Sequence, residues 1–426
     1  LSRDVSASSG AIGMTTMNRI VANLSLKDYS VFLITLMVFV TAGTPGFNVF
    51  YYSLGAVVIL RFLEFALLRK AIKQRNLTSY WVPIVSFIVY SFFSLSWAID
   101  FSRGLSRFLH IIVSGIFFLV MVHSLSNSSS LKALRLGVIF GSMFVFATSI
   151  VEYSRNPFQY RLAGAAGNAN VLALLLMIAF LILINPQMKP NLLTWIYGMV
   201  LLTYATVFTG SRKSLIIWPL ILFYIVLRNT EKRSLRSKVM TTIVVLAIFI
   251  VLLLFGELIF TCVTQITSVN RLVDAFRGEE ASAKIRSIMI REAIELWKKR
   301  PLIGFGPDQF SYYSMFGTYS HNNYVELLST SGIIGTIFYY SLFLLLFIRA
   351  VQVSDREQKY YTIISLVFLV LLDFFLVSYY AKYLWLFLST LATTLSFSSL
   401  EYNVSVSMHP DDASHFKLLD SGRRRA

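Results

Sequence analysis

The chain has 426 residues, of which 56% are hydrophobic and only 14% are charged, and its formal net charge is +17. Soluble domains usually contain about 25% charged residues, so this composition excludes an ordinary soluble protein and favours one embedded in a lipid bilayer. The positive charge does not indicate nucleic-acid binding, because the basic residues lie in gaps between apolar segments. The single cysteine, Cys262, excludes an intrachain disulfide.

Twelve apolar segments follow one another along the chain, each long enough to cross a bilayer as a helix. They lie near 29–44, 47–68, 80–99, 106–125, 134–153, 168–185, 192–208, 213–228, 239–260, 324–348, 360–377 and 383–398. The sequence therefore predicts an all-α polytopic membrane protein with about twelve transmembrane helices.

Basic residues cluster in gaps that fall on one side of the membrane if there are twelve spans. These gaps hold Arg69, Lys70, Lys73 and Arg75 after the second segment, Arg228, Lys232, Arg233, Arg236 and Lys238 after the eighth, and Arg349, Arg356 and Lys359 after the tenth. Cytoplasmic loops carry an excess of Lys and Arg. We therefore expect these gaps and both termini to be cytoplasmic.

This orientation divides the chain into five parts. They are a cytoplasmic tail at 1–28, spans one to nine at 29–260, a long external loop at 261–322, spans ten to twelve at 323–398, and a second cytoplasmic tail at 399–426. Apolar residues recur at helical spacing within the loop, at Ile285, Ile288, Met289, Ala293, Leu296 and Trp297. The spacing predicts an amphipathic helix over 282–299 that lies near the membrane surface.

Several cations lie on the predicted outer side, against the orientation rule. They are Arg103, Arg107, Arg155, Arg161, Arg212 and Lys213 beside span ends, and Arg271, Arg277, Lys284, Arg286 and Arg291 in the long loop. In one interpretation their guanidinium groups reach lipid headgroups. In the other they form a pocket for a phosphorylated ligand, because arginine binds phosphate oxygens in bidentate fashion and stays charged.

The scattered carboxylates of this region do not indicate a metal site. The sequence has no Asp-x-Asp pair in the loop and no Cys/His cluster with metal-ligand spacing. Within the spans, Arg61 and Glu64 are spaced to pair on one helical face. Asp373 has no obvious local partner, and a bond to a neighbouring helix is favoured over a role in proton-coupled transport.

The segment YSHNNYVEL, residues 319–327, joins the long loop to the tenth apolar segment. Its asparagines are good N-cap residues, and Glu326 follows Asn323 at a capping-box-like spacing. A cap does not need His321, which is the only imidazole beside the long loop. The partial positive charge of a helix N-terminus would keep that ring neutral, as a general base requires. Taken alone, a histidine at a helix start is more often structural.

The region from Arg286 onward resembles the signature of the O-antigen ligase and polymerase superfamily. Its elements are Arg286, Pro301-Leu302-Ile303-Gly304-Phe305-Gly306, Phe310, His321-Asn322-Asn323 and Gly332-Ile333-Ile334-Gly335. Two upstream stretches agree, RLAGAAGNANVLA from Arg161 and FTGSRKSL from Phe208. The resemblance covers about 160–345 well and the first 150 residues only by topology.

The resemblance implies a metal-independent glycosyltransferase of the GT-C type, with no cofactor, in the bacterial inner membrane. Such enzymes take a glycan from undecaprenyl diphosphate at the periplasmic face, which makes the loop 261–322 periplasmic. Ligase-type transfer to lipid A–core sugar is the first choice, and a polymerase that uses the same donor is close behind. A twelve-span transporter or lipid-linked glycan flippase is less favoured, because it would have two similar halves and a long central cytoplasmic loop.

The resemblance also implies roles for particular residues. His321 would be the catalytic base that takes the acceptor proton. Arg212 and Arg286 match arginines of the family, and Arg161 is a plausible third ligand of the diphosphate. Arg291 and Asn322 complete the expected substrate-binding set. Arginines placed in advance would stabilise the negative charge that develops on the leaving diphosphate.

Overall fold

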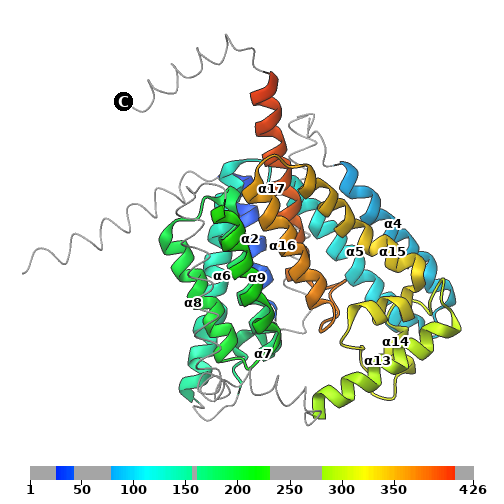
Figure 1. Cartoon of the computed structure of the whole chain (residues 1–426). Coiled ribbons are helices and arrows are strands. Elements are labelled where there is room, and N and C mark those ends of the chain that lie inside the picture. The colour runs from blue at the N-terminus through cyan, green and yellow to red at the C-terminus, as the bar shows by residue number, and fades with distance from the viewer. Residues whose placement is uncertain (1–24, 43–77, 156–160, 231–280, 408–426) are drawn as a thin grey trace, which may run out of the picture.

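The computed structural model describes residues 25–42, 78–155, 161–230 and 281–407, and all regular structure in these ranges is helical (Figure 1). The predicted spans at 47–68 and 239–260 lie outside the described residues. So do the Arg61–Glu64 pair and most of both tails.

Each predicted span inside the described ranges coincides with one helix. The helices are α2 (Leu26–Val40), α4 (Trp81–Ser94), α5 (Phe101–Ser124), α6 (Ser128–Arg155), α7 (Ala169–Leu183), α8 (Leu192–Val207), α9 (Lys213–Thr230), α15 (Asn323–Gln352), α16 (Arg356–Leu372) and α17 (Lys382–Ser407). Among the described helices, α5, α6 and α15 are long and apolar enough to cross a membrane, and α4, α7 and α8 are shorter apolar helices. The described residues are therefore all-helical and consistent with a helical membrane protein, whereas the number of twelve spans stays a prediction.

Helix α7 lies in the interior of the bundle, since every residue from Leu172 to Leu183 is buried. It packs against α6, α8, α9 and α17. Helix α4 instead has one buried face and one face of exposed apolar side chains, at Trp81, Val82, Val85, Val89, Phe92 and Phe93. A continuous apolar face of this kind is unfavourable in water and suits contact with acyl chains.

Residues predicted to be cytoplasmic meet at one end of the bundle. Nε of Arg228, near the end of α9, lies 2.8 Å from Oε1 of Glu357 in the first turn of α16. Arg349, in the last turn of α15, donates to Ser79 just before α4. Helices α13 and α14 lie at the opposite end from the C-terminal end of α17 (Figure 1). We call the end that carries them the α13 end.

Helix α13 (Ala281–Lys299) confirms the amphipathic helix predicted over 282–299, and the short α14 (Gln309–Tyr313) follows it. The apolar stripe of α13 packs on protein. Its buried residues Met289, Ala293 and Leu296 form one cluster with Phe305, Phe310 and Val325. The docking of α13 thus depends on the loop that follows it and on the first turn of α15.

Helix α15 is interrupted at Gly332, whose φ of 61° and ψ of −171° are not helical. The break removes the usual acceptors of two N–H groups and the usual donors to two carbonyls one turn earlier. The loop Pro301–Gly306 supplies all four missing partners. Ile333 N donates to Pro301 O at 2.9 Å, Ile334 N to Leu302 O at 3.2 Å, Phe305 N to Ser329 O at 3.0 Å and Gly306 N to Thr330 O at 2.8 Å. The loop is thus inserted into the hydrogen-bond ladder of the helix.

Two glycines permit this close approach of backbone to backbone. Gly304 and Gly332 both have positive φ, and a Cβ at either position would overlap the backbone of the facing segment. The hydroxyl of Tyr90 lies 2.9 Å from both Ile303 O and Ser331 O and so bridges the two segments. The Pro-Leu-Ile-Gly-Phe-Gly stretch and the Gly332 break therefore form one structural unit.

We predict that Gly304→Ala destabilises the protein more than Gly317→Ala does. Both glycines have nearly the same φ, +65° and +63°, but a Cβ at Gly317 would meet nothing within 4 Å. The control should lose only the backbone preference, about 1–2 kcal/mol, whereas Gly304→Ala must also displace the loop. Thermal unfolding of the purified variants in detergent measures the difference. Equal losses would show that the close approach is unimportant.

Candidate active site

His321 lies two residues before α15 in an unusual backbone conformation. Its φ is +59°, in the left-handed region that non-glycine residues rarely occupy. The centroid of its partly exposed ring is 4.4 Å from that of Tyr319. A residue persists in such a conformation only where its surroundings determine it.

The residues on both sides of His321 hold it in place. Oδ1 of Asn322, the N-cap of α15, accepts from Tyr324 N at 3.0 Å and Val325 N at 3.2 Å. Glu326 accepts from Ser320 N at 2.7 Å, so the turn at His321 is closed from within. Of the asparagines expected to cap this helix, Asn322 is the one that does so. Because the chain reverses at His321, Glu326 reaches Ser320 and makes no capping box with Asn323.

Asn323 instead joins His321 to the segment between α16 and α17. Its backbone N donates to Asp373 O at 2.7 Å, and its Nδ2 donates to Asp373 Oδ2 at 3.1 Å. Oδ1 of Asn323 accepts from Ser378 N at 2.9 Å. Tyr340 donates to the same carboxylate at 2.7 Å. Asp373 thus bonds to a neighbouring helix, as the sequence favoured.

Four basic side chains form a group, and two of them act on His321. Lys213 is only 8% exposed and lies within electrostatic range of Arg286, Arg161 and Arg212. Arg286 and Lys213 in turn act on His321. The group comes from three separate places: the stretch before α7, the start of α9, and α13. We call these four residues the cation cluster.

Hydrogen bonds between the two upstream motifs place Arg161 in the cluster. Arg161 Nε donates to Thr209 O at 2.9 Å, and its guanidinium also donates to Asn170 Oδ1 at 2.9 Å. Leu162 N donates to Phe208 O at 3.1 Å. The Glu152 carboxylate of α6 accepts from Ala163 N and Gly164 N at 2.8 and 2.6 Å. The RLAGAAGNANVLA and FTGSRKSL stretches are therefore bound to each other.

Burial, together with the positive charges of Arg286 and Lys213, lowers the pKa of His321 to about 4. The ring is therefore neutral at pH 7, as the sequence suggested, but burial and the cations cause this. An anion between His321 and these cations would offset their effect and raise the pKa of the ring. His321 would then become a stronger base when such a ligand is bound.

The structure brings most of the predicted site residues together. Arg161, Arg212 and Arg286 all lie within electrostatic range of Lys213, and Arg286 also acts on His321. Lys213 joins them, although nothing in the sequence favoured it over the other external cations apart from its place next to Arg212. Arg291 is exposed on α13 and is not among the charges that act on His321 or Lys213. The side chain of Asn322 is engaged in capping, and a role of either residue in substrate binding stays a prediction.

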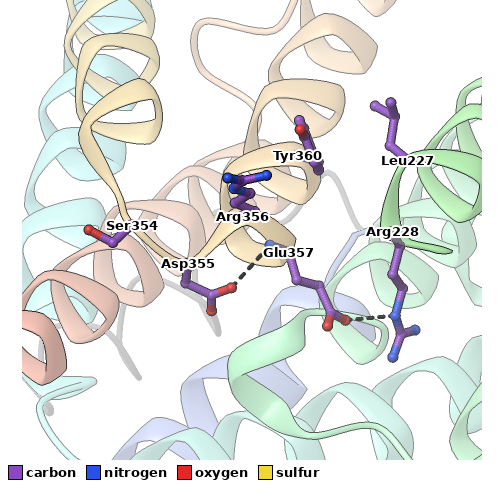
Figure 2. A pocket seen from close by; sticks show the side chains of 7 residues that line it. All are labelled: Leu227, Arg228, Ser354, Asp355, Arg356, Glu357 and Tyr360. Carbon is purple, nitrogen blue, oxygen red and sulfur yellow. Dashed lines mark hydrogen bonds and ion pairs between the residues drawn. The ribbon is translucent and has the colours of Figure 1, made fainter. Parts of the chain in front are cut away.

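A separate pocket lies away from this cluster, between the end of α9 and the start of α16 (Figure 2). Its volume is about 330 Å³, and it is lined by Leu227, Arg228, Ser354, Asp355, Arg356, Glu357 and Tyr360. Arg228 pairs with Glu357, and Asp355 caps α16 by accepting from Glu357 N at 3.0 Å. The lining has no imidazole, and its two carboxylates are engaged by Arg228 and by the first turn of α16. Within the described ranges, no group of three or more His, Cys, Asp or Glu side chains is arranged to hold a metal ion.

A family model described as O-antigen ligase matches residues 197–340. The matched region runs from within α8 into α15 and includes Arg212, Lys213, Arg286 and His321. No curated protein matches the chain. The family supports, in broad terms, a glycosyltransferase-like enzyme of ligase or polymerase type that uses a lipid-linked glycan in a membrane. The resemblance of this chain to the O-antigen ligase superfamily is therefore confirmed across residues 197–340.

Proposed function

We propose that the protein is a ligase-type glycosyltransferase. It would transfer a glycan from undecaprenyl diphosphate to a sugar hydroxyl of lipid A–core at the periplasmic face of the inner membrane. The observation that carries the proposal is a cation cluster of which two members, Arg286 and Lys213, act on a neutral, partly exposed His321. A polymerase using the same donor would share this site and is the second candidate.

The cation cluster suits a diphosphate. A group of like charges around a buried lysine is stabilised by an anion, because each cation loses hydration and repels its neighbours. A diphosphate would bring compensating charge and accept hydrogen bonds from planar guanidinium groups. Negative charge grows on the leaving diphosphate as the glycosidic bond breaks. Cations already in place stabilise that charge without reorganisation, so no divalent ion is required.

His321 suits the acceptor side of the same reaction. The acceptor oxygen forms a bond to the anomeric carbon while the bond from that carbon to the diphosphate oxygen breaks. The acceptor proton passes to the neutral imidazole, and undecaprenyl diphosphate leaves. Direct displacement inverts the anomeric centre. Donor binding would raise the pKa of His321 by offsetting Arg286 and Lys213, so the base would gain strength only when there is a glycan to transfer.

We predict that Arg286→Gln weakens donor binding and raises the pKa of His321. Loss of a charge-assisted contact should raise the KM for the lipid-diphosphate donor roughly 10–100-fold. Removal of a positive neighbour should move the pKa of His321 upward from about 4. Kinetics in nanodiscs and NMR titration of ¹³C-labelled histidine measure the two effects.

Lys299→Gln is the matched control for this variant, because Lys299 is an exposed cation at the end of the same helix. An unchanged pKa of His321 in Arg286→Gln would contradict the proposed coupling. Activity that depends strictly on a divalent ion would contradict neutralisation of the donor by the cluster.

We predict that His321→Ala lowers glycan transfer by roughly 10²–10⁴-fold, the usual contribution of a general base. Donor binding should change little, since the cation cluster remains. Asn322→Ala is the comparison: it removes the cap of α15, which costs about 1 kcal/mol, and should keep part of the activity. Glycan-transfer assays with the purified proteins measure both effects. Near-normal transfer by His321→Ala would leave the histidine a purely structural residue.

We predict that the α13 end faces the periplasm. In a Cys262→Ser background, a cysteine at exposed Lys299 should react with a membrane-impermeant maleimide in intact spheroplasts. A cysteine at exposed Ser354, between α15 and α16, should react only after lysis. The reverse pattern would overturn the orientation.

A further inference from the structure

A second polar group lies beside the His321–Tyr319 pair. Tyr319 has both Arg286 of the cation cluster and Arg107 of α5 among its charged neighbours. Arg107 is not among the charges that act on His321 or on Lys213. Tyr319 therefore borders two distinct cationic groups, of which only one is suited to the diphosphate.

Arg107 is held against an aromatic ring and a carboxylate. Its Cζ lies 3.8 Å from the ring centroid of Tyr380, which is partly exposed and follows α16. One terminal nitrogen lies 3.1 Å from Asp308 Oδ1. The edge of His110 also faces Tyr380, with 6.4 Å between ring centroids. Tyr319 and Tyr380 lie within electrostatic range of each other, which connects this group to His321.

The Arg107–Asp308 pair is not the only contact that docks the loop on α5. Gln309 already does this, because its side chain accepts from Asp100 N and donates to Asp100 O, both at 2.9 Å. Asp308 has a φ of +57°, unfavourable for a non-glycine residue, and its carboxylate makes no cap of α14. Nε of Arg107 is buried with no hydrogen-bond partner among the described residues. These features indicate a group shaped for something other than stability.

The chemistry of the group fits a sugar. A tyrosine ring offers flat apolar faces with a polar edge, which suit the C–H face of a pyranose, and Arg107 covers one of the two faces of Tyr380. A carboxylate and a guanidinium accept from and donate to vicinal hydroxyls, and a few such groups set orientation in a binding site. A diphosphate fits poorly, because the Asp308 carboxylate pairs with Arg107 and adds negative charge to the group.

We propose that Tyr380, Tyr319, Arg107 and Asp308 form the subsite that binds the acceptor sugar and directs one of its hydroxyls at His321. This inference rests on the proposed function and extends it to the second substrate. The subsite is only partly covered by the family match: Asp308 and Tyr319 lie inside residues 197–340, whereas Arg107 and Tyr380 lie outside.

Binding of simple glycosides tests the subsite. The probes are methyl β-glycosides of glucose, galactose and N-acetylglucosamine, followed by saturation-transfer NMR with the full chain in nanodiscs. We expect at least one to bind the wild-type protein, and Tyr380→Leu to weaken it roughly tenfold or more. Asp308→Asn should weaken it too, and Tyr380→Phe, which keeps the ring, should retain most of it. Inorganic diphosphate should not displace the glycoside.

Tyr360→Leu is the matched control, because Tyr360 lies beside Arg356 in the pocket at the other end of the bundle (Figure 2). It should leave glycoside binding unchanged. No binding to the wild-type protein, equal binding by Tyr380→Leu, or displacement by inorganic diphosphate would each overturn the subsite. If Tyr380→Leu does not fold, Asp308→Asn and Tyr380→Phe carry the comparison.

Two-substrate kinetics separate this proposal from the proposed function. Tyr380→Leu should raise the KM for a glycan acceptor roughly tenfold or more and leave the KM for the lipid-diphosphate donor unchanged, the opposite of Arg286→Gln. Glycan transfer with no effect of Tyr380→Leu on the acceptor KM would refute the subsite and leave the proposed function standing. Glycosides that bind at Tyr380 in a protein without any transfer activity would refute the proposed function instead.

Discussion

The exchange of backbone hydrogen bonds between the loop Pro301–Gly306 and the break in α15 is the constraint on which the α13 end depends. Four backbone groups lose their helical partners at Gly332, and the loop satisfies each of them. Unpaired backbone groups at the edge of a membrane protein are costly, so break and loop are stable only together. This pairing also positions the residues that come after the loop's first turn. The apolar face of α13 packs on Phe305 and Phe310, and Asp308 forms an ion pair with Arg107.

The short first part of α15 is thereby anchored at both ends. The loop holds Ser329 and Thr330 at one end, and the Asn323–Asp373 bonds hold the other. His321 sits at the outer tip of this anchored segment in a left-handed conformation. The strained backbone at His321 is compatible with a stable fold because hydrogen bonds on both sides fix the backbone conformation there. An imidazole fixed in this way can be aimed at a substrate without further ordering.

Charge divides the proposed site into two halves. Arg161, Arg212, Lys213 and Arg286 form a group of like charges, whereas Arg107 pairs with Asp308. His321 and Tyr319 lie at the boundary between the two halves. Donor and acceptor can then be recognised by different physical means, the first by charge and the second by ring faces and hydroxyl contacts. The low pKa of His321 depends in part on the first half and would change with its occupancy.

Local patterns determined a large part of this protein. The length of the apolar segments predicted the helices, and the helical spacing of Met289, Ala293 and Leu296 predicted α13. The motifs singled out His321, Arg212 and Arg286 from the sequence alone. Only the tertiary structure decided which of many external cations meet. It selected Lys213 and Arg161 and left Arg291 exposed, because proximity between α9, α13 and the stretch before α7 is set by packing between distant segments. The bond of Glu326 to Ser320, formed in place of a capping box, and the pairing of Arg107 with Asp308 also escaped the sequence. Each depends on a turn at a residue with positive φ, His321 or Asp308, which spacing along the chain does not reveal.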